Sequence, residues 1–213
     1  LVGIVTVDDA MLVLQDETTE DISIMAGVSP NEDSYFGTSV FQHAKNRSLW
    51  LMLLMLSATV TGEILGYYED AMAVMPVLIT FIPMLMGTGG NCGSQSSTLV
   101  IRGLAVGEIE FRDILKVLFK EIRVALVVGT LLATVNGIRI YIMYDQNIML
   151  ALALGITMIA VVSMAKCIGC ILPLLAKKLG LDPAIMAAPL ITTILDTCTI
   201  LVYFNIVTAF FNL

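Results

Sequence analysis

The sequence predicts an all-α membrane protein with five transmembrane helices in each chain. Of its 213 residues, 58% are hydrophobic and only 14% are charged. The mean hydropathy is +0.92. A soluble domain is nearer half apolar and a quarter charged. This composition excludes a soluble globule, a nucleic-acid-binding protein and a disordered tail, so we expect a lipid bilayer around the chain.

Five stretches are apolar enough to cross a bilayer as helices, which takes roughly 20 residues. Each stretch contains at most one charged side chain. Only two acidic residues, Glu69 and Asp70, separate the first stretch from the second, so we expect a tight hairpin there. The expected spans are 48–68, 71–101, 124–144, 146–176 and 183–213.

Basic residues lie mostly on one side of these spans. Nine of the eleven Lys and Arg residues precede the first span or follow the second or fourth, whereas the opposite connections hold only Arg139. Basic residues collect in cytoplasmic connections. We therefore expect a cytoplasmic N-terminus and an external C-terminus.

The net charge of −7 is concentrated near the N-terminus. Residues 1–33 hold eight acids and no base, whereas residues 34–213 hold ten acids and eleven bases, so the two parts carry −8 and +1. The acidic run 15–21 is typical of a solvated helix surface. Carboxylates without nearby bases are also the ligands that hard divalent cations prefer. Both interpretations stay open.

Residues 1–7 form a β-branched run that predicts a strand, followed by a helix capped by Asp8 or Asp9. Because one strand and one helix cannot enclose a core, we expect residues 1–28 to end a larger cytoplasmic domain. Since the chain begins at Leu1 inside this strand, we expect it to be a piece of a longer protein. Residues 29–47 predict an amphipathic connecting helix, and residues 48–213 the transmembrane domain.

Asp196 is the only charged residue of the fifth span and lies near its middle. A carboxylate at that depth is costly, so it marks a functional site. Thr192 and Thr193 lie one turn before it and Thr199 one turn after, which gives one face hydroxyls and a carboxylate, as in a hydrated pathway. Ala188 belongs to a pair of small residues that permits close helix approach.

Lys166 offers the structural alternative for Asp196, because the two could form a buried ion pair. We expect Lys166 instead to extend its side chain toward the cytoplasmic interface. An intramembrane aspartyl protease needs a second aspartate on another span, and the other spans contain none. We therefore expect no enzyme.

The second span contains a glycine-rich polar string that does not suit lipid. Polar groups at this depth are tolerated only inside protein or along water. Its glycines also suit tight helix packing, and this alternative stays open. The string comprises Gly87, Gly89, Gly90 and Gly93 together with Asn91 and Gln95.

The remaining candidate ligands give no site. The single histidine, His43, forms neither a metal site nor a catalytic pair. The four cysteines all lie within expected spans, where we expect buried free thiols. Glu63, late in the first span, fits either an outer vestibule or a surface position.

Together these residues resemble the MgtE family of magnesium channels, often called transporters. The resemblance rests on Gly-Thr-Gly-Gly-Asn-x-Gly-x-Gln-Ser-x-Thr-Leu-x-Ile-Arg at 87–102 and Leu-Ile-Thr-Thr-Ile-Leu-Asp at 190–196. Residues 1–9 also resemble the end of a CBS domain, so the resemblance covers essentially the whole chain. Ser94 departs from it, because many members carry Asn there.

The resemblance implies a homodimer in the cell membrane with its pore between the subunits. It also implies that Asp196 binds a hydrated Mg²⁺, with Mn²⁺, Co²⁺ or Ca²⁺ as further candidates for the same site. The pore-lining candidates are Thr192, Thr193, Gly87, Gly90, Asn91, Gln95 and Ala188. The candidates for regulatory metal binding are Asp9, Glu17, Glu20, Asp21 and Asp182.

The function that follows from this resemblance is passive Mg²⁺ influx down the electrochemical gradient, closed by cytosolic Mg²⁺. A wide, acidic pore suits an ion that sheds its water reluctantly. The alternative is an ion-coupled secondary transporter in which Asp196 titrates.

Overall fold

The computed structural model describes residues 3–31, 34–144 and 147–213, apart from the side chain of Ala188. Every regular element in this part of the chain is helical. The α-helices are α1 (Val7–Met25), α2 (Val40–Tyr67), α3 (Glu69–Val74), α4 (Ile82–Ala105), α5 (Ile114–Met143), α6 (Ile148–Lys178) and α7 (Ala188–Phe211). The 3-10 helices are η1 (Pro76–Phe81), η2 (Phe111–Asp113) and η3 (Pro183–Met186).

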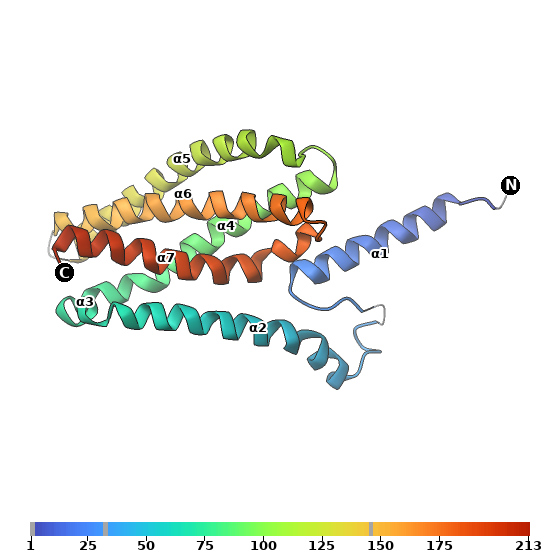
Figure 1. Ribbon diagram of the computed structural model, residues 1–213, viewed down its shortest axis with the longest axis horizontal. Helices are drawn as coiled ribbons and strands as arrows, with labels where there is room; N and C mark the ends of the chain where they lie inside the picture. Colours follow the sequence, from blue (N-terminus) through green and yellow to red (C-terminus); the bar gives the residue numbers. More distant parts are fainter. Residues whose placement is uncertain (1–2, 32–33, 145–146) are drawn as a thin grey trace.

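The long helices form a bundle from which α1 projects at one end (Figure 1). The connections between α4 and α5 and between α6 and α7 lie at the same end as α1. The α2–α3 turn, the α5–α6 connection and the C-terminus lie at the other end. The base-rich connections of the sequence therefore share one end of the bundle.

Helix α4 crosses the bundle between the other long helices (Figure 1). It packs against α6 and α7, and α5 packs against α6. The buried Tyr203 of α7 donates a hydrogen bond to the carbonyl of Leu78 (2.8 Å), which fixes η1 and the start of α4 against α7. Helix α2 reaches the bundle mainly through α7, where the Oγ1 atoms of Thr61 and Thr197 share a hydrogen bond of 2.6 Å.

The strand predicted for residues 1–7 is absent from its described part, and α1 begins at Val7. A strand needs a hydrogen-bonding neighbour, and the described chain supplies none. The predicted cap is also corrected, because Thr6 is the N-cap and Asp9 completes a capping box. Two hydrogen bonds lower the pKa of the Asp9 carboxyl: the larger effect comes from the Thr6 hydroxyl and the smaller from the Thr6 backbone N–H.

The predicted connecting helix over residues 29–47 forms only in its second half. Residues 29–31 and 34–39 are not helical, and the Ser39 hydroxyl caps α2 by accepting the N–H of Gln42 (3.2 Å). Pro30 disfavours helix at Ser29. From Val40 the helix runs without a break to Tyr67, so this segment is continuous with the first span.

The second expected span is broken into α3, η1 and α4, with Pro76 and Pro83 each near the start of a helical segment. Proline suits the first turn of a helix because its missing N–H needs no partner there. Four described segments are long and apolar enough to cross a membrane: Val40–Tyr67, Phe111–Met143, Ile148–Lys178 and Pro189–Phe211. Helix α4 is not among them, since its middle is glycine-rich and polar.

Candidate cation site between α4 and α7

Helix α4 has one face inside the bundle and one face outside it. The buried face includes Gly89, Gly93 and Ser96. The exposed face repeats at every third or fourth residue and carries Gly87, Asn91, Gln95 and Thr98 among others. An exposed polar stripe on a helix surrounded by apolar spans is unfavourable against lipid.

The glycines divide between the two roles left open by the sequence. A Cβ on Gly169 of α6 would collide with the carbonyl of Gly93, so these two backbones approach closely. A Cβ on Gly89 would lie 2.8 Å from Oγ1 of Thr199 on α7. By contrast, nothing lies within 4 Å of a Cβ on Gly87. Packing therefore explains Gly89 and Gly93 but not Gly87.

Asp196 lines an open hollow of about 490 Å³ between α4 and α7. Its carboxylate is half-buried and has no hydrogen-bonding or ion-pair partner within the described part of the chain. The hollow is lined by Pro83, Met86, Gly87, Gly90 and Asn91 on α4 and by Thr192 and Asp196 on α7. A carboxylate, an amide and a threonine thus share one space, and the Thr192 hydroxyl donates to the carbonyl of Pro189 (3.1 Å).

Five sequence-based candidates line this hollow: Asp196, Thr192, Gly87, Gly90 and Asn91. Pro83 and Met86 were missed, because their side chains carry no ligand chemistry. Thr193 does not line it, and its hydroxyl donates to the carbonyl of Pro189 (3.0 Å). Gln95 is exposed further along α4, and the side chain of Ala188 lies outside the described residues.

The expectation for Thr199 was wrong. It is 1% exposed and faces α4, so it contributes no hydroxyl to a hydrated pathway. Asp196 and Thr199 thus both adjoin α4, but Asp196 lines the hollow whereas Thr199 is buried against Gly89.

Lys166 was also predicted wrongly. It is only 5% exposed, and its Nζ lies 3.7 Å from Oε2 of Glu121 on α5. Lys166 is therefore buried inside the bundle rather than extended to its surface, and it pairs with Glu121 rather than Asp196. A basic residue so deep in an apolar helix stays there only with a partner, and Glu121, which sequence reasoning overlooked, is that partner.

The four cysteines are free thiols, as expected, with Cys92 and Cys170 buried. Glu63 is exposed on α2.

Two of the candidate regulatory acids, Asp21 and Asp182, lie where α1 contacts η3. Asp182 caps η3 by accepting the N–H of Ala184 (2.8 Å). Burial raises the pKa of the Asp21 carboxyl, and the nearby charges of Asp182 and Glu17 raise it further. Two acids from distant parts of the sequence thus repel each other here. Among the described residues, no three His, Cys, Asp or Glu side chains form a complete metal site.

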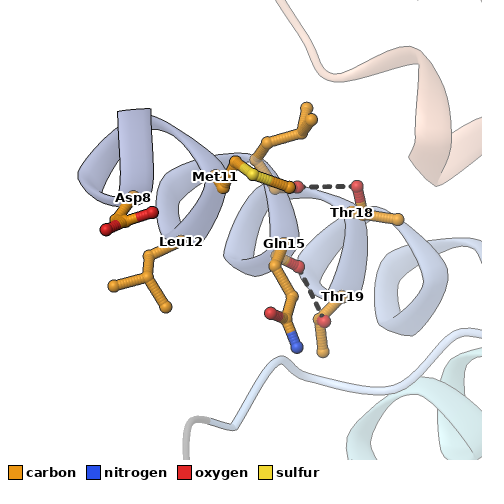
Figure 2. A pocket seen from close by; sticks show the side chains of 7 residues that line it. Asp8, Met11, Leu12, Gln15, Thr18 and Thr19 are labelled. Atoms are coloured by element: carbon orange, nitrogen blue, oxygen red, sulfur yellow. Dashed lines mark hydrogen bonds between the residues drawn. The ribbon is translucent and has the colours of Figure 1, made fainter. Parts of the chain in front are cut away.

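The remaining acids lie on α1, which buries none of its side chains. Asp9, Glu17 and Glu20 are exposed on this projecting helix. A hollow along α1 is lined by Met11 and Leu12 beside Asp8 and Gln15 (Figure 2) and also by Leu14, Thr18 and Thr19. The hydroxyls of Thr18 and Thr19 beside it bond to backbone carbonyls one turn earlier (2.7 and 2.8 Å). This surface therefore offers apolar contact and one carboxylate, that of Asp8, rather than a cluster of acids.

The region that contains the hollow matches a known protein family. A family model named MgtE and described as a divalent cation transporter matches residues 82–206, more than half of the chain and all of the hollow. The chain belongs to the MgtE family. The resemblance predicted from the two motifs is thereby confirmed. The family is not enzymatic, and this MgtE chain is a multi-pass membrane protein.

Three curated relatives are each named magnesium transporter MgtE. Those of Thermus thermophilus and Bacillus subtilis are 36% identical to this MgtE chain over 206 and 212 residues, 97% and 100% of it. That of Enterococcus faecalis is 34% identical over 213 residues, 99% of it. The alignments cover 45%, 46% and 46% of the relatives, so this chain spans less than half their length.

Proposed function

We propose that this chain forms a channel-like pore through which Mg²⁺ enters the cell down its electrochemical gradient. The observation that carries the proposal is the unpartnered carboxylate of Asp196, half-buried in an apolar span and facing Asn91 across a hollow. A buried charge without a partner is costly. A cation that passes through the hollow would supply the missing countercharge.

Mg²⁺ suits this hollow because it usually keeps several waters and binds through one or two carboxylates. The hollow offers one carboxylate, one amide and one hydroxyl rather than a closed cage of ligands. Mn²⁺, Co²⁺ and Ca²⁺ remain candidates for the same site. Inside-negative voltage stabilises an entering dication by about 4.6 kcal/mol per 100 mV, so no ATP is needed.

We propose that the pore lies between two copies of the chain. The hollow between α4 and α7 is open, and the polar stripe with Asn91 and Gln95 is exposed. A second copy would cover this stripe and would place a second Asp196 across the axis. Two carboxylates separated by water attract a dication yet release it, which conduction requires.

In this proposal α4 is the fifth membrane-crossing helix, although it is less apolar than the other four. A pore-lining helix contacts water on one face, which removes the need for a uniformly apolar surface. The end of the bundle with α1 and the base-rich connections is cytoplasmic, in keeping with the distribution of Lys and Arg. Helix α1 then adjoins the cytoplasmic CBS domain that residues 1–9 resemble.

We further propose that cytosolic Mg²⁺ closes the pore by binding where α1 meets η3. Mg²⁺ there would offset the repulsion between Asp21 and Asp182 and hold α1 against the bundle, with Asp9, Glu17 and Glu20 as further candidate ligands. The Ser97 hydroxyl of α4 donates to the carbonyl of Met186 in η3 (2.6 Å), so η3 contacts both the acids and the pore-lining helix. A change at the acids would thereby reach α4.

The test is Mg²⁺ uptake into proteoliposomes under an imposed inside-negative voltage. We expect Asp196→Asn to reduce the uptake at least tenfold, because a loss of only 1.4 kcal/mol of attraction already changes an equilibrium by that factor. Glu110→Gln is the matched control, since Glu110 pairs with Arg112 on the exposed surface (2.9 Å) and should leave the uptake unchanged.

Uptake that persists in Asp196→Asn with unaltered ion preference would overturn the pore assignment. A second arm replaces voltage with a pH gradient. Uptake that follows the pH gradient alone would favour ion-coupled secondary transport with Asp196 as the titrating group.

A further inference from the structure

A buried polar cluster joins three helices on the side of α4 away from the hollow. The hydroxyl of Ser96 on α4 donates to Oε2 of Glu121 on α5 (2.6 Å). Lys166 Nζ on α6 lies 3.7 Å from the same carboxylate oxygen and donates to Oγ of Ser96 (3.3 Å). Ser96 is fully buried, and the Lys166 and Glu121 side chains are 6% and 13% exposed.

This cluster has no part in the cation path proposed above. None of its three residues lines the hollow. A buried ion pair rarely stabilises a protein more than well-packed apolar residues do. Charges inside a membrane-spanning segment are kept where function requires them. The cluster therefore calls for a role other than general stability.

The position of Ser96 on α4 indicates that role. Ser96 lies nine residues after Gly87 and five after Asn91, which places it about 180° and about 140° around the helix from them. Gly87 and Asn91 both line the hollow. The cluster thus holds the back of α4 while the front of the same helix faces Asp196.

Apolar side chains of α4 such as Leu85, Val100 and Leu104 pack in the core, and its backbone approaches α6 and α7 closely through glycines, at Gly93 against Gly169 and at Gly89 against Thr199. Glycine permits close approach but has no side chain to interlock with a neighbour. Ser96 lies one turn beyond Gly93 and makes directional hydrogen bonds to two other helices. Apolar and glycine contacts have little directionality, whereas these hydrogen bonds tie one point on the back of α4 to α5 and α6 and so constrain its rotation.

We propose that Lys166 and Glu121 are positioning residues that fix the rotation of α4 through Ser96. They thereby set how Asn91 faces Asp196 and so determine the affinity and ion preference of the hollow. This inference rests on the proposed function, because it assigns a task to α4 only if the hollow carries the cation.

The first experiment tests the cluster by thermal unfolding of the purified chain in detergent. Lys166→Met or Glu121→Gln leaves one charge buried alone, so each should lower Tm by on the order of 10 °C. The double variant leaves no uncompensated charge and should recover most of that loss. Lys116→Met is the control, because Lys116 pairs with Asp113 on the exposed surface (2.8 Å) and should not shift Tm.

The second experiment tests positioning by transport through folded protein. Ser96→Ala keeps the Lys166–Glu121 pair but detaches it from α4. We expect a small change in Tm, together with a threefold to tenfold rise in the half-saturating Mg²⁺ concentration or an equal fall in the Mg²⁺/Ca²⁺ flux ratio, roughly the effect of one hydrogen bond. A purely structural residue would change the amount of folded protein but neither of these quantities.

The outcomes separate the two proposals. Equal Tm losses in both single variants and the double variant would show that the charges are not coupled, which overturns the cluster. Unchanged affinity and ion preference in Ser96→Ala, while Asp196→Asn abolishes uptake, would overturn the positioning role and leave the pore intact. Continued uptake in Asp196→Asn would instead reject the pore, whereas the Tm comparison would still test the cluster.

Discussion

Glu121 and Asp196 are both partly buried carboxylates, and they differ in whether they have hydrogen-bonding or ion-pair partners. Glu121 accepts from Ser96 and pairs with Lys166, whereas Asp196 has neither kind of partner among the described residues. Both residues are acids in apolar surroundings. Sequence spacing singled out Asp196, because Glu121 stands beside the bases of the α4–α5 connection and resembles a surface acid. Only packing against α4 and α6 makes Glu121 a buried residue.

Thr199 gives a prediction at the residue scale. Its buried Oγ1 has no hydrogen-bond partner among the described residues. Thr199→Val should therefore raise the free energy of unfolding by roughly 1 kcal/mol, because an unsatisfied hydroxyl is removed at nearly constant shape. Thr157→Val is the control: that buried hydroxyl donates to the carbonyl of Ala153 (2.8 Å), and its loss should lower stability by a similar amount. Chemical unfolding in mixed detergent measures both, and a loss in Thr199→Val would contradict the prediction.

At the scale of elements, hydrophobic length identified four helices well and misjudged their ends. The predicted connecting helix over residues 29–47 is helical only in part and continues into α2, and α5 begins at Ile114, ten residues before the span predicted to start at 124. Helix ends depend on local caps such as Ser39 rather than on apolar length. The second span shows the same limit, because two prolines divide an apolar stretch into three helical segments.

The contact of α4 with α6 gives a prediction at the element scale. Gly169→Ala should destabilise the bundle by about 1–3 kcal/mol, because the new Cβ collides with the backbone of Gly93, which cannot move away as a side chain can. Gly137→Ala on α5 is the matched control: nothing lies within 4 Å of its Cβ. That change should be neutral or should stabilise by up to about 1 kcal/mol through helix propensity. Equal stability of the two variants would argue against the close α4–α6 contact.

Over the described molecule, α1 contacts the bundle at η3, and the segment that follows α1 contacts the start of α2. The chain turns at Gly27, whose φ of +70° suits glycine, and a Cβ there would collide with the indole of Trp50 on α2. Asp21 and Asp182 repel each other at the adjoining contact between α1 and η3. Any ligand that neutralises these acids would strengthen the docking of α1, and any loosening would expose Trp50 to water.

Trp50 is the only tryptophan of the chain, so its fluorescence reports this contact alone. We expect Mg²⁺ to shift its emission to the blue, because the ion would offset the acid repulsion and hold Gly27, just after α1, against the indole. The double variant Asp21→Asn/Asp182→Asn should be blue-shifted without Mg²⁺ and should not respond to it. K⁺ at equal ionic strength controls for screening. A full Mg²⁺ response in the double variant would contradict a regulatory site at these acids.

The sequence by itself determined the class of protein, four of the five helical spans and the acid that lines the hollow. The length of each apolar stretch, the distribution of Lys and Arg, and a carboxylate within an apolar span can all be read from the sequence without knowing which residues are in contact. The tertiary structure decided which side of each helix faces which partner. Whether Thr199 faces the hollow, Lys166 pairs with Glu121 or a glycine packs depends on the rotation of helices against one another, and contacts far apart in the sequence fix that rotation.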